Sequence, residues 1–322
     1  MKELISNGLE FKGIGHYLPE TIITNEDIRT RLKYPEMHPA EKAVMGDIGV
    51  NKRHRSSEKE DPIFMASKVA EMALKDANIS PEEIDLFLLA NWTDRSYVPE
   101  LAPRASDLSG TKNALAFDIS TACSGFVHGV MMASAYAATG RFKKILVIGS
   151  ERFSIRTKIG GYGEFTAGDA AAGVVLEQTG KKNTGVYDYF LKDYGNLHDI
   201  IMIGPPPQSY IKSFPTLPGN ASRLTLEAID KLLKDNSLSA NDIDWFIPHP
   251  GTDVVLQDVL ANCPFPKEKI LFNFPEVGNT SAASIPIVMS EFYSKGKLKH
   301  GDLVLACAVG AGFYSGGLLF RF

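Results

Sequence analysis

The chain contains 322 residues, of which 44% are hydrophobic and 22% are charged, proportions typical of an ordinary globular protein. This length is sufficient for two packed cores or one large core. The formal net charge of −4 argues against a broad nucleic-acid-binding surface, although a local basic patch at residues 52–55 is compatible with an acidic partner. We therefore expect no nucleic acid among the partners of this protein.

We expect a cytoplasmic protein without a membrane span. Residues 1–13 contain no apolar stretch of the kind found in secretory signals, and no apolar run in the chain approaches the ~18 residues of a membrane helix. The three cysteines, Cys123, Cys263 and Cys307, are widely spaced, which excludes a disulfide framework and a CxxC metal site. Thiols in such a pattern are typical of the reducing cytosol.

Strands and helices are predicted to alternate through the first half of the chain. Residues 11–25 indicate a strand, then a turn, then the start of a helix with Asn25 as its cap. Residues 62–78 carry apolar side chains at helical spacing, and residues 80–83 indicate a capped helical turn. The further elements expected here are strands at 84–91, 115–121, 145–150 and 172–178, and a helix at 123–140.

The second half shows the same alternation after a middle segment, 183–221, that reads as rich in loops. The strands are short apolar runs, as strands buried on both faces require, so the pattern predicts an α/β layered architecture. The elements expected here are helices at 222–235, 252–262 and 281–295, and strands at 243–248, 270–273, 302–309 and 315–321.

Two segments of the chain are similar enough to indicate a duplication. Residues 74–93 and 233–252 are identical at eight of twenty positions without a gap, at an offset of 159. Between this landmark and a second one near residue 300, Cys123 falls where Asn279 falls in the other copy. A repeat of this size is a duplicated domain and not a solenoid.

We therefore expect two similar halves, at 1–178 and 179–322, packed as helix–sheet–helix–sheet–helix with shared central helices. The first half contains the candidate nucleophile, and the second contains a histidine and an asparagine. Different polar groups at matching positions of two similar halves indicate one site assembled between them.

Cys123 is the candidate nucleophile because it lies where a predicted strand runs into a predicted helix. The unpaired N–H groups and positive dipole of a helix N-terminus can lower the pKa of a thiol. On local sequence alone, a small buried hydrophobic role for Cys123 is an equal alternative. Cys263 precedes Pro264 and Cys307 lies inside a strand, so neither is expected to react.

His249 and Asn279 are the candidate partners of Cys123. His249 directly follows a buried strand, at the sheet edge where α/β proteins place ligands. Asn279 precedes an apolar helix, where an ordinary helix cap is the alternative, as a turn residue is for His249. A thiol beside two neutral hydrogen-bond donors suits thioester chemistry, in which donors stabilise a carbonyl oxygen as it gains charge.

Several motifs together resemble the β-ketoacyl-acyl-carrier-protein synthase III family of the thiolase superfamily. They are DISTACSGF around Cys123, the histidine of IDWFIPHPG, GNTSAAS around Asn279, Gly168-Asp169, and VGAGF at 309–313. The resemblance extends from GIGHYLPE to the terminal LLFRF, which is nearly the whole chain.

The resemblance implies a dimeric, thiolase-like αβαβα protein without a resident cofactor. It implies that Cys123 carries an acyl group, and that His249 and Asn279 stabilise the enolate formed on decarboxylation. It also implies an oxyanion hole made by the backbone N–H groups of Cys123 and Gly312. Acyl-CoA or acyl-carrier thioesters would be the substrates, and a homodimer the assembly.

The chain departs from the family's pattern at three places. Lys42 and Gly46 stand where a tryptophan and an arginine usually clasp the CoA nucleotide, and Val254 replaces a further arginine near the tunnel mouth. The partner-facing loop that usually ends in Phe-Pro reads Tyr-Val-Pro, so Val98 is expected to give the acyl pocket a different depth.

The sequence therefore predicts a condensing enzyme that loads an acyl group on Cys123 and then performs a decarboxylative Claisen condensation. The second substrate would be a malonyl- or β-ketoacyl-type thioester, in fatty-acid or specialised polyketide-like biosynthesis. Two alternatives stay open: an acyltransferase that forms an ester or amide on the same fold, and a non-catalytic partner subunit.

Overall fold

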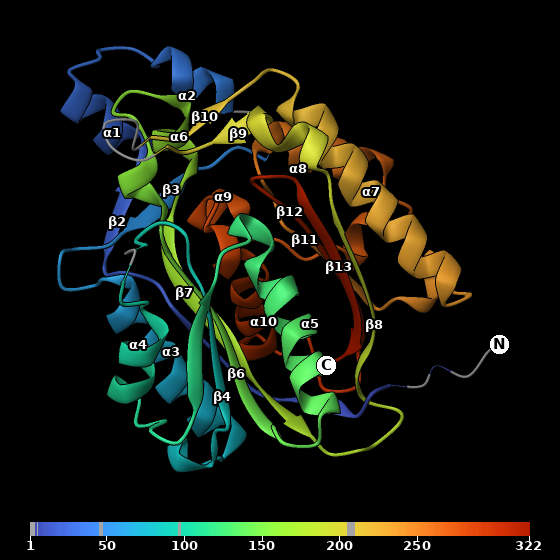
Figure 1. Cartoon of the computed structure of the whole chain (residues 1–322). Helices are drawn as coiled ribbons and strands as arrows, with labels where there is room; N and C mark the ends of the chain where they lie inside the picture. The colour runs from blue at the N-terminus through green and yellow to red at the C-terminus, as the bar shows by residue number, and fades with distance from the viewer. Residues whose placement is uncertain (1–3, 5, 45–47, 96–97, 205–209) are drawn as a thin grey trace.

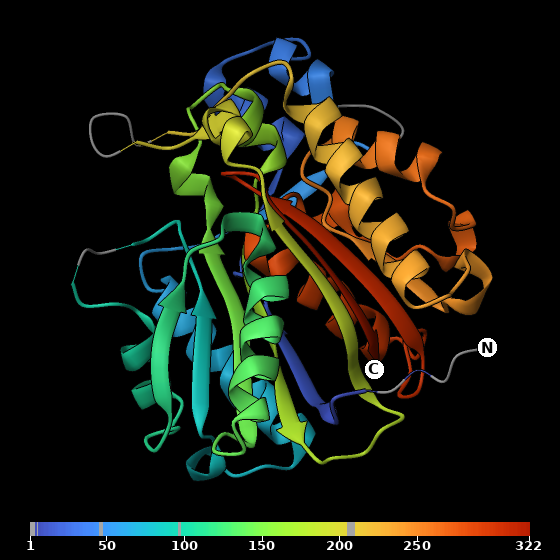
Figure 2. The same cartoon turned by 45° about the vertical axis from the view of Figure 1, so that its right-hand side comes forward.

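The protein is built of five layers, in which two β-sheets enclose a central layer of helices and each sheet carries helices on its outer face (Figure 1). The computed structural model describes residues 4, 6–44, 48–95, 98–204 and 210–322. Figure 2, turned by 45°, shows the two sheets on either side of α5 (Gly125–Ala138). The αβαβα arrangement predicted from the duplication is confirmed.

The first sheet is formed by strands of the first half, in the order β1-β7-β6-β4-β5. Strands β4, β5 and β6 are mutually parallel where they pair, whereas β7 is antiparallel to both β6 and β1. The strands are β1 (Leu9–Tyr17), β4 (Leu86–Ala90), β5 (Leu115–Ile119), β6 (Lys144–Arg152) and β7 (Asp169–Gln178).

The second sheet is formed by strands of the second half, in the order β11-β12-β13-β8. Its parallel pair is β11 with β12, and β13 is antiparallel to both of its neighbours. The strands are β8 (Gly185–Asp193), β11 (Trp245–Pro248), β12 (Leu303–Gly310) and β13 (Tyr314–Arg321).

The helices form three layers. Helices that are apolar on most sides lie between the sheets, and helices with one apolar face cover the outside of a sheet. Helix α5 and helix α10 (Ser284–Ser294) lie between the sheets, and both are buried along most of their length. Helix α3 (Pro62–Ala77) packs on the outer face of the first sheet, and its apolar residues belong to the cluster that includes Phe87 and Leu146. Helix α7 (Leu217–Asp235) covers the second sheet in the same way.

Shorter elements complete the chain and frame the layers. The helices are α1 (Asn25–Leu32), α2 (Pro39–Val44), α4 (Ala102–Leu108), α6 (Tyr162–Thr166), α8 (Asp253–Asn262) and α9 (Phe274–Val277). The strands are β2 (Thr21–Thr24), β3 (Lys52–Arg55), β9 (Ile201–Met202) and β10 (Lys212–Ser213). Within the described ranges, none of the helices combines the length and apolar character that crossing a membrane requires.

Several sequence predictions about local structure were wrong. Helix α1 is capped by Thr24, not Asn25, because Thr24 and Asp27 form a reciprocal capping box. Residues 270–273 form no strand, and only Ile270 makes a bridge, to Phe246. The nine-residue strand β8 was missed inside the segment read as loops.

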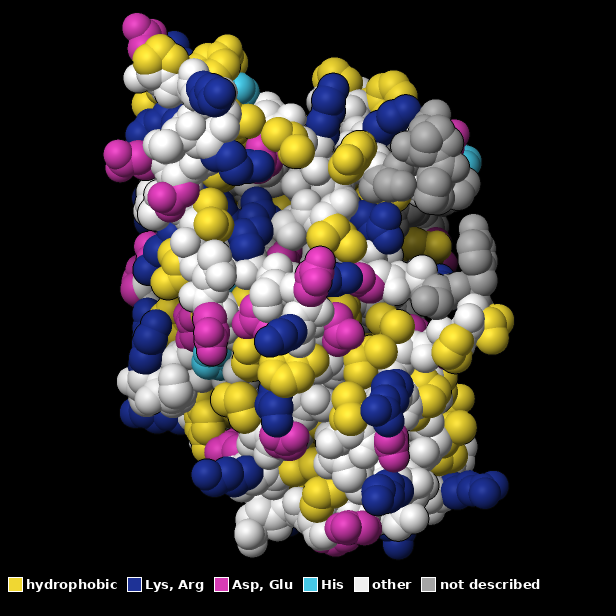
Figure 3. All heavy atoms as spheres, turned by 90° about the vertical axis from the view of Figure 1, so that its left-hand side faces the viewer, with side chains coloured by type: hydrophobic (Ala, Val, Ile, Leu, Met, Phe, Trp, Pro, Cys, Tyr) yellow, Lys and Arg dark blue, Asp and Glu magenta, His cyan; other side chains and the backbone are white. Residues whose placement is uncertain are grey.

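Figure 3 shows the face of the protein that lies on the left in Figure 1. Lysine and arginine side chains are interspersed there with aspartate and glutamate, and apolar side chains lie among them. The charges on this face are therefore mixed, in keeping with the small net charge of the chain.

Candidate active site

Cys123 follows strand β5 and lies in a 3-10 turn, Ala122–Ser124, that leads into helix α5. Ala122 has a left-handed backbone with φ of +48°, which bends the chain sharply between strand and helix. Gly125 allows the helix to start here, because a Cβ at this position would lie 2.6 Å from the Cβ of Ala90. The turn thus holds the thiol where the first half meets the second.

His249 follows strand β11 directly, and its backbone N–H donates to the carbonyl of Cys307 at 2.8 Å. The ring is buried, and its Nδ1 lies 2.7 Å from the hydroxyl of Ser284. In the described part of the structure, the buried Nε2 atom has no hydrogen-bond partner. Burial lowers the pKa of His249 to about 3, so the imidazole is neutral near pH 7.

Asn279 is held from both sides in the loop before helix α10. Its backbone N–H donates to the carbonyl of Thr166, and its side-chain Nδ2 donates to the carbonyl of Gly251 at 2.6 Å. Its Oδ1 accepts from the backbone N–H of Ser281 at 2.8 Å. The amide is therefore fixed in one orientation, with its second N–H left for another acceptor.

These three residues line one cavity of about 330 Å³. The structure therefore brings together the cysteine, histidine and asparagine that the sequence singled out. Four aromatic side chains also line this cavity: Trp92, Phe153, Tyr162 and Phe313. Lys158 lies in its wall as well, and brings a positive charge to an otherwise largely apolar surface.

The other two predicted site residues lie elsewhere. Val98 has a side chain that is 87% exposed and does not line the cavity of its own chain. Gly312 lines an adjoining groove of about 920 Å³, whereas Gly310 and Ala311 stand in the wall beside Cys123.

A helix N-terminus can lower the pKa of a thiol, but the surroundings of Cys123 act mainly in the opposite direction. Burial raises the pKa of the thiol to about 12, and the nearby carboxylate of Glu151 acts in the same direction. A hydrogen bond from Ser281 acts in the opposite direction. Because the turn recesses the thiol into the cavity, desolvation outweighs the effect of the helix terminus.

The pairing of Cys123 with Asn279 across the duplication was wrong, by three residues. The 3-10 turn before α5 begins at Ala122, and the matching turn before α10, Ser281–Ala283, begins at Ser281. The equivalent of Cys123 is therefore Ala282. The offset between the turns is 159, the same as in the repeated segments.

Two residues near the thiol were missed by the sequence analysis. The hydroxyl of Ser281 donates to the Sγ of Cys123 at 3.5 Å, and the indole N–H of Trp92 donates to that hydroxyl at 2.7 Å. Ser281 is part of the GNTSAAS motif, but its contact with Cys123 spans 158 residues. Local sequence carries no signal for such a contact.

Two of the positions expected to lack a nucleotide clasp, Lys42 and Val254, are not among the residues that line the cavity. Lys42 is exposed on helix α2, and Val254 is 48% exposed on helix α8. Gly46 lies outside the described residues. The basic side chains that do line the cavity and its adjoining groove are Lys158, Arg95 and Arg156.

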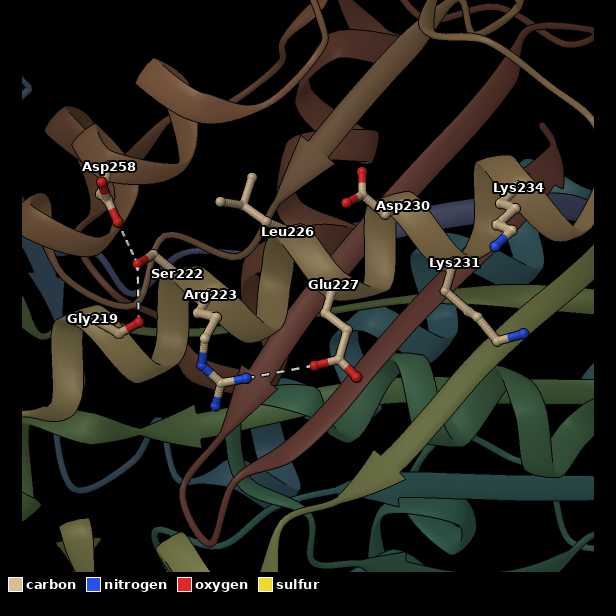
Figure 4. A pocket seen from close by; sticks show the side chains of 9 residues that line it. All are labelled: Gly219, Ser222, Arg223, Leu226, Glu227, Asp230, Lys231, Lys234 and Asp258. Atoms are coloured by element: carbon tan, nitrogen blue, oxygen red, sulfur yellow. Dashed lines mark hydrogen bonds and ion pairs between the residues drawn. The ribbon is translucent and has the colours of Figure 1, made fainter.

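A separate hollow of about 590 Å³ lies along helix α7 and contains none of the predicted site residues. Figure 4 shows that Ser222 bonds Asp258 and that Arg223 pairs with Glu227, whereas Asp230, Lys231 and Lys234 have no partner among the residues drawn. Because Cys123, His249 and Asn279 all lie outside this hollow, the candidate site is the cavity at Cys123.

A duplicated αβαβα fold with cysteine, histidine and asparagine around one cavity defines the class of thiolase-like condensing enzymes. Residues 117–195 match the family "3-Oxoacyl-[acyl-carrier-protein (ACP)] synthase III", and residues 233–322 match its C-terminal family. The chain is 31% identical to β-ketoacyl-[acyl-carrier-protein] synthase III of Ruegeria pomeroyi, over 96% of this chain and 98% of that protein. The enzyme of the same name from a Sulfurovum strain is 32% identical, over 94% of this chain and 92% of that protein.

Solved structures agree with this placement. The crystal structure of 3-oxoacyl-[acyl-carrier-protein] synthase III from Aquifex aeolicus superimposes with a TM-score of 0.90 at 30% identity, over 98% of this chain and all of that one. The Pseudomonas aeruginosa enzyme gives the same score at 26% identity, over 98% of each chain. The chain belongs to the β-ketoacyl-[acyl-carrier-protein] synthase III family and is a condensing enzyme with acyltransferase chemistry.

Proposed function

We propose that the chain transfers an acyl group from a thioester to Cys123 and then condenses it with a decarboxylating malonyl- or β-ketoacyl-type thioester. The observation that carries this proposal is the convergence of Cys123, His249 and Asn279 on one cavity. Cys123 is the nucleophile, and the other two side chains are neutral donors for the enolate oxygen that forms when carbon dioxide leaves.

The hydrogen bonds of the two donors support these roles. When the Ser284 hydroxyl donates to Nδ1 of His249, the ring proton is on Nε2, which is buried and unpaired in the described structure. Asn279 uses one N–H for Gly251 and keeps the other for the substrate. Both donors are neutral near pH 7, as stabilisation of a transient anion by preorganised dipoles requires.

For the oxyanion hole, the geometry supports the backbone N–H groups of Cys123 and Ala311. Ala311 is in the cavity wall beside Cys123, whereas the originally expected Gly312 lies in the adjoining groove. The two donors would stabilise the tetrahedral intermediate formed when the thiol attacks a thioester carbonyl.

We infer that acyl-CoA or acyl-carrier thioesters are the donors. Relatives that are named β-ketoacyl-[acyl-carrier-protein] synthase III match this chain over nearly its whole length. The pantetheine arm, common to both donor types, would enter past Lys158 and Thr252. A free pantetheine thioester that loads within about 100-fold of its CoA counterpart, a difference of 2.7 kcal/mol, would support weak recognition of the nucleotide.

We further propose a homodimer. Strand β5 is the edge of the first sheet, and Leu115 on it is 49% exposed, so a second copy could extend the sheet there. In such a dimer the exposed Val98 would reach the acyl pocket of the partner. Free thiols at the three cysteines fit a protein of the cytosol. Light scattering during gel filtration tests the dimer.

The test of the function is product analysis. The protein is incubated with a panel of acyl-CoA and acyl-carrier donors, and intact mass spectrometry identifies those that load Cys123. A malonyl thioester is then added, and the expected product is a β-ketoacyl thioester with release of carbon dioxide. An ester or amide product would instead show an acyltransferase, and no loading by any donor would favour a non-catalytic subunit.

A further inference from the structure

A buried glutamate near the thiol has no part in the chemistry described so far. Glu151 lies near the end of strand β6, and its side chain is buried. One carboxylate oxygen, Oε2, accepts three hydrogen bonds, from the backbone N–H groups of Trp92 and Thr93 and from the hydroxyl of Thr93. These three donors fix the carboxylate in one orientation.

The other oxygen of Glu151 is the unusual atom. Oε1 is buried and has no hydrogen-bond partner within the described part of the chain. Burial raises the pKa of Glu151 to about 8, while Thr93, the backbone of Trp92 and Thr93, and the neighbouring hydroxyl of Ser281 act to lower it. A buried acceptor without a donor is costly, so its position beside an exchangeable hydroxyl requires an explanation.

Ser281 links this carboxylate to the nucleophile. Its hydroxyl donates to the Sγ of Cys123 at 3.5 Å and is near enough to Glu151 to lower the pKa of that carboxyl. The indole N–H of Trp92 is a donor only, so it occupies one of the two lone pairs of the serine oxygen. One lone pair and one proton of Ser281 are left, and they can be exchanged between Cys123 and Glu151.

We propose that Ser281 and Glu151 form a proton relay that removes the proton of the Cys123 thiol during acyl loading. As Sγ attacks the thioester carbonyl, the thiol proton passes to the oxygen of Ser281, and the serine proton passes to Oε1 of Glu151. When the carbon–sulfur bond of the donor breaks, the proton returns through Ser281 to the departing sulfur. Acyl-Cys123 and a free thiol are formed, and Glu151 is a carboxylate again.

The hydrogen bonds are balanced in both states of this relay. In the structure, Ser281 accepts from Trp92 and donates to Sγ of Cys123. For the relay its hydroxyl turns, so that before transfer it accepts from Cys123 and donates to Oε1. After transfer, it accepts from Trp92 and Glu151 and donates to the thiolate. Once the hydroxyl has turned, Oε1, which is unpaired in the described structure, has a partner in each state of the relay. Trp92 keeps the serine in position throughout.

Other titratable groups around the site are less suited to accept this proton. Burial keeps the pKa of His249 at about 3, so its ring is a weak base. Arg152, next to Glu151, pairs with Asp94, and Asp169 on the adjacent strand accepts from Ser56 and Ser154. Asp61 is engaged as the N-cap of the neighbouring helix α3. Arg156, in the turn after strand β6, donates to the Thr93 carbonyl.

The test compares Glu151→Gln with the unaltered protein in single-turnover loading of Cys123, followed by intact mass spectrometry from pH 6 to 10. A proton acceptor typically contributes 100- to 10,000-fold, so we expect loading of Glu151→Gln at pH 8 to be at least about 100-fold slower. In the unaltered protein the rate should rise until Glu151 is ionised, near pH 8, and then level. In the variant it should continue to rise with the thiol's own ionisation.

A purely electrostatic role gives the opposite result. The charge of Glu151 raises the pKa of Cys123, so without a relay its removal would make the thiol more acidic and loading faster. Loading that is unchanged or faster in Glu151→Gln, or that keeps the original pH profile, would overturn the proposal. Ser281→Ala should reproduce the slow, shifted profile, because it breaks the same route.

The relay rests on the proposed function, in which Cys123 is the residue that is acylated. A second measurement therefore distinguishes failure of the relay from failure of the proposed function. Alkylation of Cys123 by iodoacetamide also requires loss of the thiol proton, but needs no acyl donor. If no donor loads the protein, the proposed function fails, whereas slower alkylation in Glu151→Gln still supports the relay. Glu41→Gln is the matched control, since Glu41 is a buried glutamate paired with Arg29 and does not line the cavity.

Discussion

Ala122 and Ser281 adopt nearly the same left-handed backbone conformation, with φ of +48° and +53°. Each begins a 3-10 turn that leads into a central helix, and the two turns pack against each other. Non-glycine residues in this region cost on the order of 1–3 kcal/mol each and persist only where the surroundings impose them. The duplication therefore places two strained turns face to face, one supplying the thiol and the other the hydroxyl that contacts it.

We predict that Cys123 is the only residue acylated. It is the cysteine in the wall of the cavity with His249 and Asn279, whereas Cys307 is buried in strand β12 and Cys263 ends helix α8. Cys123→Ala should abolish acyl loading, and Cys263→Ser should load at the rate of the unaltered protein. Peptide mapping of the adduct checks this, and stoichiometric label on Cys263 or Cys307 would refute it.

The sequence predicted the layers well because buried strands and amphipathic helices leave regular apolar patterns. Strands β4 and β6 and helix α3 were each recognised in this way. Strand β8 was not predicted, because it is an edge strand whose apolar residues are interrupted by Asp188 and Lys192. Residues 270–273 were predicted as a strand because they are apolar, but they pack without forming a ladder.

The site was predictable in part for a similar reason. Cys123, His249 and Asn279 each occur in a local motif, and the structure places all three around one cavity. The contact of Ser281 with the thiol and the orphaned oxygen of Glu151 depend on residues far apart in the chain. Such contacts are consequences of tertiary packing and leave no periodic or local signal.

We predict that Asn279→Ala retains acyl loading but loses condensation. Loading requires the thiol and the oxyanion hole, whereas the enolate requires the donors, and loss of one donor costs about 100- to 1,000-fold in rate. Loading is followed by mass spectrometry, and decarboxylation by release of labelled carbon dioxide.

Asn262→Ala provides the control, because among the described residues the side chain of Asn262 bonds only to Asp258, within helix α8. Asn279 also anchors the loop through Gly251 and Ser281, so the melting temperature must be recorded for both variants. Condensation by Asn279→Ala at the original rate would reduce this residue to a structural role.

We predict that His249 makes the folded protein sensitive to acid. Its pKa is about 3 when folded but about 6.5 in an unfolded chain. The unfolded state therefore binds an additional proton between these values, so stability falls as the pH falls from 6.5 toward 3.

In urea unfolding at pH 7.5 and pH 5, His249→Gln should lose less stability on acidification than the unaltered protein, by up to roughly 2 kcal/mol. His198→Gln is the control, because the side chain of His198 is exposed. An equal loss in the unaltered protein and in His249→Gln would contradict the assignment of a buried, neutral imidazole.

We predict that Trp92 limits the length of the acyl group. Its indole lines the cavity beside Cys123, packs edge-on against Phe153 at 5.2 Å between ring centroids, and is anchored by the hydroxyl of Ser281. Trp92→Ala should open space next to the thiol, so loading should shift toward longer acyl chains.

A methylene group in an apolar pocket changes specificity by about 10- to 200-fold, so the ratio of long-chain to short-chain loading should rise at least about tenfold in Trp92→Ala. The ratio is the informative quantity, because loss of the indole N–H would slow the loading of every donor. Trp92→Phe is the matched control: it loses the N–H but keeps an aromatic ring, and its chain-length preference should stay close to the original. If both variants retained the original preference, the length limit would lie in another part of the cavity wall or in a partner subunit.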